Sequence, residues 1–148
     1  MFIAHMASPI TPPTRYFVGF STQNSSKIGV TTLYDIDLIN ADLMMAFQTK
    51  VGERVMRPDY GCHLWEYLME PFSQYLAEQI VTEATRICEL DSRCTVMNVQ
   101  VYEADQGFRI EALLAYLPWN VINTFQVTFQ QNDLVYYGSS NPNTLLAQ

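Results

Sequence analysis

Apolar residues recur at helical spacing in two segments, which predict the main helices of the fold. The first segment spans about residues 35–48, where Asp35 can cap the N-terminus of a helix. Its apolar stripe contains Ile36, Ile39, Leu43 and Phe47. The second segment begins at Ser73, after a short helical turn at about 63–69 that Pro71 ends, and reaches about residue 90. Its stripe, the clearest in the chain, contains Leu76, Ile80, Ala84 and Ile87.

Beyond residue 92 the apolar period changes to two, which predicts β-strands. Valines alternate with polar residues up to position 104, and a turn at Asp105-Gln106-Gly107 leads into an apolar segment at 108–117. A third run at 121–129 sets aromatic and β-branched residues against neutral polar ones. With a short aromatic strand at 16–20, the pattern predicts an α+β fold. We expect a three-stranded antiparallel meander packed with two main helices, plus a short N-terminal strand and arm.

The chain length suits one domain, since 148 residues can bury a core of ordinary size. We expect a flexible, proline-rich N-terminal arm at residues 1–15, a single domain at 16–132 and a C-terminal tail at 133–148. Residues 112–132 carry no charge over 21 positions. Because Pro118 and several Asn and Gln side chains interrupt that stretch, it does not predict a membrane-spanning helix.

Charge is scarce and unevenly distributed. Charged residues make up 16% of the chain, against about 25% in typical globular domains. Residues 1–58 carry 5 basic and 4 acidic groups, and residues 59–148 carry 3 and 11, which gives the total of −7. A chain this acidic has no extended positive face to bind phosphates. A nucleic-acid partner is therefore not expected.

The residues that could support a metal site or a reactive thiol do not form the patterns those sites need. The three cysteines, Cys62, Cys88 and Cys94, lack a CxxC spacing, and only His63 lies beside one of them. Neither a disulfide framework nor a zinc site is indicated, and adjacent Cys and His side chains rarely face each other. We therefore expect buried thiols, no metal and no cofactor.

Acidic residues near the middle of the chain raise the possibility of a glycosidase. Such an enzyme needs two carboxyl groups at a set separation, one of them with a raised pKa. Four carboxylates lie within 18 residues: Glu53, Asp59, Glu66 and Glu70. Arg54 and Arg57 lie in the same stretch and favour ionised, paired carboxylates, so a structural role is the better interpretation.

The C-terminal quarter of the sequence is almost uncharged. From residue 112 to residue 148 the only charged side chain is Asp133. An open edge strand normally carries Lys, Glu or Pro to prevent pairing with another chain, and residues 121–131 carry none of them. Two interpretations follow: the strand is central in its own sheet, or a partner strand completes its edge.

One motif resembles a known family. The segment Lys50-Val-Gly-Glu-Arg-Val-Met-Arg-Pro-Asp-Tyr-Gly61, followed by Leu64-Trp-Glu-Tyr-Leu-Met-Glu-Pro71, is similar to the baseplate wedge and sheath-initiator family of contractile phage tails. The family also includes a baseplate component of type VI secretion systems and is often labelled lysozyme-like. The resemblance covers about residues 34–129. Its motif residues are Gly52, Glu53, Arg54, Met56, Arg57, Pro58, Asp59, Tyr60 and Gly61.

The resemblance implies a non-enzymatic building block of the tail baseplate in the virion, assembled in the host cytoplasm, with six copies around the tail axis. The implied partners are baseplate wedge proteins, the tail sheath protein and, as a further neighbour, the tail tube, with no nucleic acid or membrane. The implied contacts with wedge partners fall at Trp65, Glu70, Pro71 and Phe72. The implied sites of pairing with a sheath strand, which would start sheath assembly, are Val121, Phe125, Val127, Thr128 and Phe129.

Several alternatives remain open at the sequence level. Arg54 and Arg57 can brace their own segment, through Asp59 or backbone carbonyls, or contact a neighbour. Family members often follow the Glu-Pro pair with Arg, whereas Phe72 stands here, which favours an apolar contact. The other functions are a type VI secretion component, a peptidoglycan-cleaving lysozyme-like enzyme and a dimeric regulatory adaptor.

Overall fold

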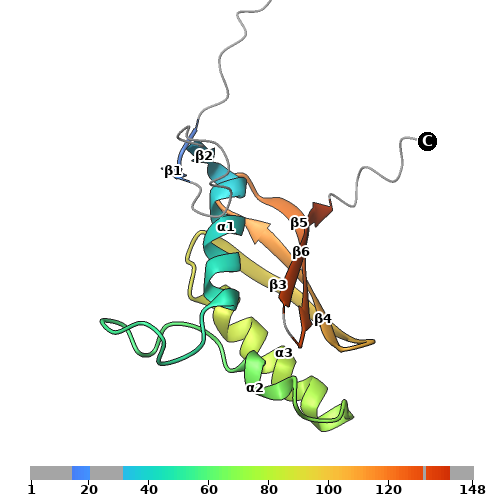
Figure 1. Cartoon of the computed structure of the whole chain (residues 1–148). Coiled ribbons are helices and arrows are strands. Elements are labelled where there is room, and N and C mark those ends of the chain that lie inside the picture. Colours follow the sequence, from blue (N-terminus) through green and yellow to red (C-terminus); the bar gives the residue numbers. More distant parts are fainter. Residues whose placement is uncertain (1–14, 21–31, 132, 141–148) are drawn as a thin grey trace, which may run out of the picture. The chain divides into compact units, whose positions relative to one another are not determined.

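The computed structural model describes residues 15–20, 32–131 and 133–140 (Figure 1). The chain divides into two compact units, Met1–Leu38 and Ile39–Gln148. Most of the N-terminal arm expected at residues 1–15, and residues 141–148 of the expected tail, lie outside the described residues. The elements are β1 (Val18–Phe20), β2 (Thr32–Tyr34), α1 (Asp35–Gln48), α2 (Leu64–Tyr67), α3 (Gln74–Glu89), β3 (Cys94–Ala104), β4 (Gly107–Tyr116), β5 (Val121–Gln130) and β6 (Asp133–Ser140).

The first unit contains a small antiparallel pair of strands. β1 pairs with β2, with Gly19 opposite Leu33. The Asp35 carboxylate accepts hydrogen bonds from the backbone N–H groups of Tyr16 and Phe17, at 2.8 and 3.0 Å. The backbone N–H of Asp35 donates to the carbonyl of Phe17 at 3.0 Å. The first residue of α1 therefore fixes the start of this strand pair.

The core of the second unit lies between its helices and one face of its sheet. Phe47 of α1 stacks on Phe125 of β5 with ring centroids 5.8 Å apart, and meets Phe129 edge-on at 6.1 Å. α3 packs chiefly on β3. It begins as the sequence predicts, because the Ser73 side chain accepts a hydrogen bond from the N–H of Leu76 at 3.2 Å. Its predicted apolar stripe is buried: Leu76, Ile80, Ala84 and Ile87.

The sheet of the second unit is antiparallel throughout, in the order β3-β4-β5-β6. The predicted hairpin turn at Asp105-Gln106-Gly107 joins β3 to β4, and Phe108 lies opposite Phe129 in the β4–β5 ladder. The α+β class is confirmed. The strand count differs, because residues 133–140 form β6 rather than a tail, and a fourth strand joins the predicted three. The apolar run of β6 is short and ends in Gly138-Ser139-Ser140, so it lacks the alternation that identifies β3–β5.

Among the described residues, no helix is both long enough and apolar enough to span a bilayer.

Candidate functional site

The motif segment forms a loop between α1 and α2 that extends away from the helices and the sheet (Figure 1). At its base, Lys50 and Cys62 form an isolated parallel bridge, and the N–H of Cys62 donates to the carbonyl of Thr49 at 2.9 Å. Further out, the N–H of Gly52 donates to the carbonyl of Pro58 at 2.9 Å. The two sides of the loop are therefore joined at two levels, although the loop contains no helix or extended ladder.

Glycine is required at the base of this loop. Gly61 has a φ of +113°, and a Cβ there would lie 2.5 Å from the carbonyl oxygen of Thr49. Gly52 has a φ of +85°, but a Cβ there would meet no atom within 4 Å. Both glycines allow a backbone conformation that L residues rarely adopt, and Gly61 also allows the close approach of the two sides.

The two motif arginines have different surroundings. The Arg54 guanidinium lies over the Tyr60 ring, 4.0 Å from its centroid, and its Nη2 lies 3.3 Å from the Met45 sulfur of α1. Arg54 therefore braces the loop by stacking. Arg57 is exposed and forms no ion pair within the described part of the chain. Of the alternatives that the sequence leaves open, bracing through Asp59 is not seen: within the described residues, neither arginine forms an ion pair with it.

A partly buried ion pair on α3, between Arg86 and Glu83, attaches the end of the loop to the helix. The sequence analysis did not identify it. Arg86 donates through Nη2 to the carbonyl of Gly61 at 2.9 Å and to Glu83 at 2.7 Å. Glu83 also accepts the backbone N–H of His63 at 3.0 Å. Burial raises the pKa of Glu83, but the hydrogen bonds from Arg86 and His63 outweigh burial and hold that pKa below its ordinary value. The i, i+3 spacing of Glu83 and Arg86 on a helix was the available signal.

Trp65, predicted to contact a wedge partner, makes most of its contacts within the domain. Its indole N–H donates to the carbonyl of Phe47 at 2.9 Å. Its ring meets Phe129 edge-on at 5.2 Å, and the Lys50 ammonium lies 5.6 Å from the ring centroid. The half-buried ring thus fastens α2 to the core.

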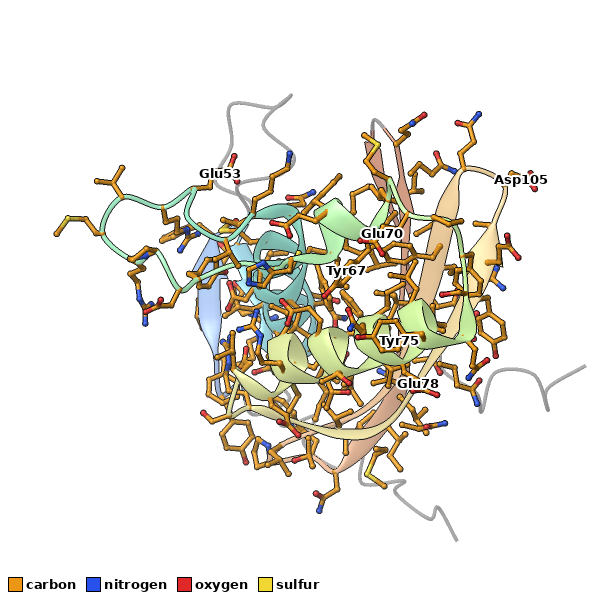
Figure 2. The ribbon with its side chains drawn as sticks, turned by 90° about the horizontal axis from the view of Figure 1, so that it is seen from below. Glu53, Tyr67, Glu70, Tyr75, Glu78 and Asp105 are labelled. Atoms are coloured by element: carbon orange, nitrogen blue, oxygen red, sulfur yellow. The ribbon has the colours of Figure 1, made fainter. Side chains whose placement is uncertain are left out.

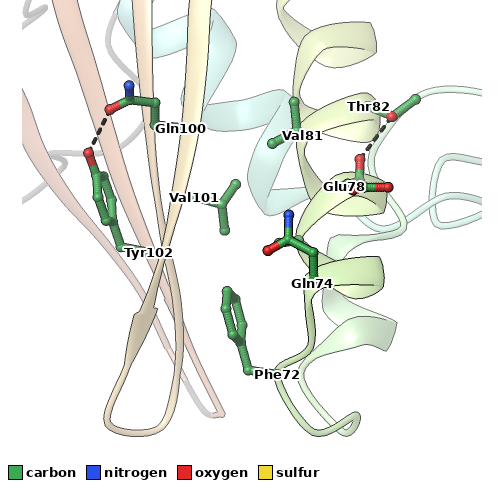
Figure 3. Close-up of a pocket in the computed structure, with 9 residues that line it drawn as sticks. Phe72, Gln74, Glu78, Val81, Thr82, Gln100, Val101 and Tyr102 are labelled. Atoms are coloured by element: carbon green, nitrogen blue, oxygen red, sulfur yellow. Dashed lines mark hydrogen bonds between the residues drawn. The ribbon is translucent and has the colours of Figure 1, made fainter.

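Glu70, Pro71 and Phe72 are exposed in the connection between α2 and α3. Phe72 lies at one end of an open groove of about 630 Å³ between α3 and β3 (Figure 3). Apolar side chains of both elements form its floor, and Glu78 lies on its helical side. The lining residues are Phe72, Gln74, Ala77, Glu78, Val81, Thr82, Gln100, Val101 and Tyr102. The structure therefore gives Phe72 an apolar surface that continues beyond its own ring.

The β5 residues predicted to pair with a sheath strand are occupied within the domain. β4 pairs along β5 on one side, and β6 pairs with it from Thr124 to Gln130 on the other. Phe125, Val127 and Phe129 are buried in the core, Thr128 is buried as well, and Val121 is half-buried. The prediction of an incoming strand is wrong for Phe125, Val127, Thr128 and Phe129, because β6 already pairs along β5 from Thr124 to Gln130. Val121 lies outside that ladder. Within the described sheet, the outer strands are β3 and β6.

The candidate catalytic carboxylates do not form a site of the glycosidase kind. Glu53, Glu66 and Glu70 are all exposed to solvent, whereas a glycosidase acid lies in an apolar cleft. Figure 2 shows Glu53 on the motif loop, well separated from Glu70 beside α2. Glu53 and Glu70 therefore belong to separate parts of the surface.

The three cysteines are free and buried. Cys62 lies with its sulfur 3.1 Å from the carbonyl oxygen of Phe47, and burial raises the pKa of its thiol to about 12. His63 is exposed, and its Nδ1 lies 3.7 Å from a carboxylate oxygen of Glu66, whereas the Cys62 thiol donates to the carbonyl of Phe47. Burial also raises the thiol pKa of Cys88 to about 12 and that of Cys94 to about 11. Over the described ranges, no group of three or more His, Cys, Asp or Glu side chains could hold a metal ion.

Comparisons with known proteins agree with the sequence motif. The family model described as baseplate wedge protein gp25 matches residues 35–117, more than half of the chain. A crystal structure of a proposed tail lysozyme from Geobacter sulfurreducens is similar, with a TM-score of 0.58 and 23% identity over 64% of this chain and 89% of that one. A chain of the six-fold symmetrised anti-feeding prophage (AFP) baseplate gives a TM-score of 0.58 and 21% identity over 68% of this chain and 85% of that one. No curated protein sequence matches significantly.

Proposed function

The chain belongs to the baseplate wedge protein gp25 family, and on that premise we propose that it joins wedge proteins in a contractile tail baseplate and starts assembly of the sheath. The observation that carries the proposal is the braced motif loop, which lies inside the matched residues 35–117. An enzyme would concentrate its polar groups in a cleft, whereas here they fix an exposed loop. The component is structural, and we propose six copies around the tail axis.

We propose that one wedge protein contacts the groove between α3 and β3. The groove offers apolar surface from Val81, Val101 and Phe72, together with the carboxylate of Glu78. A partner segment with an apolar anchor and a neighbouring basic side chain fits this surface, because the anchor loses its exposure to water and the base meets Glu78. Phe72 thus replaces a charged contact with an apolar one.

We propose that the first sheath strand pairs with the outer edge of β6. An antiparallel sheet ends in a row of unpaired backbone N–H and C=O groups, which another chain can use. From residue 112 to residue 148 the single charge is Asp133, so the β6 segment lacks the Lys and Glu residues that usually protect an edge. β3, at the other edge, contains Glu103 and a β-bulge between Val96 and Asn98, both of which hinder pairing.

Paired proline substitutions in β6 test the sheath contact. Successive backbone N–H groups of a strand point to opposite edges, so Val135→Pro and Tyr136→Pro remove donors from different sides. One variant breaks the ladder to β5 and lowers the melting temperature. The other leaves the fold intact, and baseplates that contain it should carry no sheath. Normal sheath on baseplates with the stably folded variant would contradict pairing at β6.

The lysozyme alternative has one observation in its favour, the name of the similar Geobacter sulfurreducens protein. We propose that this chain does not cleave peptidoglycan, since its candidate acids are all exposed to solvent and none lies in an apolar cleft. The purified protein should release no fragments from isolated cell walls. If it does, Glu53→Gln, Glu66→Gln and Glu70→Gln identify the acid by the variant that loses turnover.

A further inference from the structure

The outermost turn of the motif loop presents two large apolar side chains to solvent. The N–H of Arg57 donates to the carbonyl of Arg54 at 3.2 Å, which closes a four-residue turn with Val55 and Met56 in the middle. Val55 is 94% exposed and Met56 is 91% exposed, more than any other large apolar side chain of the described residues. The central positions of such turns usually hold Gly, Asn, Asp or Pro. The turn itself does not require two bulky apolar residues at these positions, which points to a contact with another molecule.

The turn stands on a fixed base. The stacking of Arg54 on Tyr60, at 4.0 Å, joins the two sides of the loop. The hydrogen bond from Gly52 to Pro58, at 2.9 Å, joins them as well, and the carbonyl of Gly61 accepts a hydrogen bond from Arg86 at 2.9 Å. Because the loop is braced at several levels, Val55 and Met56 cannot reach the domain's own core. Their exposure is a property of the folded protein, and a rigid apolar tip loses little freedom when it is buried by a partner.

The surroundings of the tip indicate the chemistry of that partner. Arg57, directly after Met56, is exposed and makes no ion pair with any described residue. A hollow of about 330 Å³ lies beside the tip, lined by Met56, Arg57, Pro58, Asp59, Tyr60 and Leu90. The tip is therefore a projection with a recess at its side. A partner pocket can enclose the two apolar side chains while its rim enters the recess and meets the guanidinium of Arg57.

We propose that Val55 and Met56 insert into an apolar pocket of another baseplate protein, and that a carboxylate on the rim of that pocket pairs with Arg57. This inference rests on the proposed function and adds a second docking surface to the α3–β3 groove. In this account the motif has two roles. Gly52, Arg54, Tyr60 and Gly61 build the base, and the tip makes the contact. An apolar centre surrounded by a polar rim is the usual anatomy of a protein–protein interface.

Substitution of the tip, compared with a matched site, tests the inference. The test variants are Val55→Ser/Met56→Ser and Met56→Ser, and the control is Met97→Ser, a methionine on β3 that is 57% exposed. All are surface changes, so urea unfolding midpoints should stay close to that of the unchanged protein. The amount of the double variant in purified particles, relative to the other baseplate proteins, should be at least tenfold lower than that of the unchanged protein. The amount of Met97→Ser should be unchanged. Arg57→Glu should reduce incorporation as well.

A photo-crosslinking residue at position 56 identifies what the tip contacts. Crosslinks from assembled baseplates should join this position to an apolar segment of a different baseplate protein, with Asp or Glu nearby. Normal incorporation of the double variant, or crosslinks only to a second copy of this chain, would overturn the inference. Absence of the unchanged protein from purified baseplates would instead overturn the proposed function, so the two failures are distinguishable.

Discussion

Alanine at Gly61 should destabilise the domain far more than alanine at Gly52, although both glycines have positive φ. Alanine at Gly52, φ +85°, meets no atom within 4 Å. The free energy of unfolding therefore falls only by the strain of a left-handed conformation, about 1–2 kcal/mol. The stiffer unfolded chain offsets about 0.4–1 kcal/mol of that loss. At Gly61 the same strain applies, and a Cβ would lie 2.5 Å from the oxygen of Thr49 and 2.9 Å from the carbonyl carbon of Lys50.

Relief of that overlap requires the two sides of the loop to separate. The hydrogen bond from Cys62 to Thr49 is then lost, at about 1 kcal/mol, and Cys62, which is 1% exposed, must shift within the core. Strain and the lost hydrogen bond together give about 1–2.6 kcal/mol for Gly61→Ala. The shift of Cys62 within the core adds about 1 kcal/mol, for a total of about 2–4 kcal/mol, against about 0–1.6 kcal/mol for Gly52→Ala. Urea titration followed by circular dichroism measures both values. At this chain length, about 3 kcal/mol corresponds to a melting temperature lower by roughly 6–12 °C. Equal destabilisation by the two variants would refute the steric argument.

Three further predictions concern the core, a charged contact and the thiols. Phe129→Ala should cost about 3–5 kcal/mol, because its fully buried ring contacts three other aromatic rings; a loss under about 1 kcal/mol in urea titration would contradict this packing. Glu83→Gln should destabilise most at neutral pH: the pKa of Glu83 is lowered on folding, so its contribution is present above the ordinary value of about 4.5 and is lost as pH falls through the folded value. Unfolding titrations at pH 7 and pH 3 check whether the difference from the unchanged protein shrinks in acid; a constant difference would contradict it. The buried thiols of Cys62, Cys88 and Cys94 should react with a disulfide reagent at pH 8 only as the protein unfolds, and immediate labelling of the folded protein would show that they are accessible.

The sequence predicted best the elements whose signals are local. The stripe of α3 and the Ser73 cap lie within one helix, and the β3–β4 hairpin is set by alternation around Gly107. β6 was missed because pairing with β5 depends on long-range contact and its own alternation is weak. The uncharged character of β5 allows two interpretations, and the structure confirms the first of them: β5 is a central strand of its own sheet, between β4 and β6.

The candidate site was predictable in composition but not in arrangement. The motif identified the residues of the loop, yet the division between base and tip depends on which side chains find partners across it. Arg54 stacks on Tyr60 and contacts the sulfur of Met45, whereas Arg57 forms no ion pair with any described residue. The resemblance implies a partner contact at Trp65, whereas its edge-on contact with Phe129 and its half-buried ring, which the sequence does not show, also fasten it to the core.

The composition of purified contractile particles tests the central claim most directly. If the chain is a baseplate component, mass spectrometry of particles separated from free protein should detect it together with the other baseplate proteins. Antibody labelling in electron micrographs should place it at the baseplate end of the tail. Intact particles that lack the protein, or that carry it only elsewhere along the tail, would contradict the account.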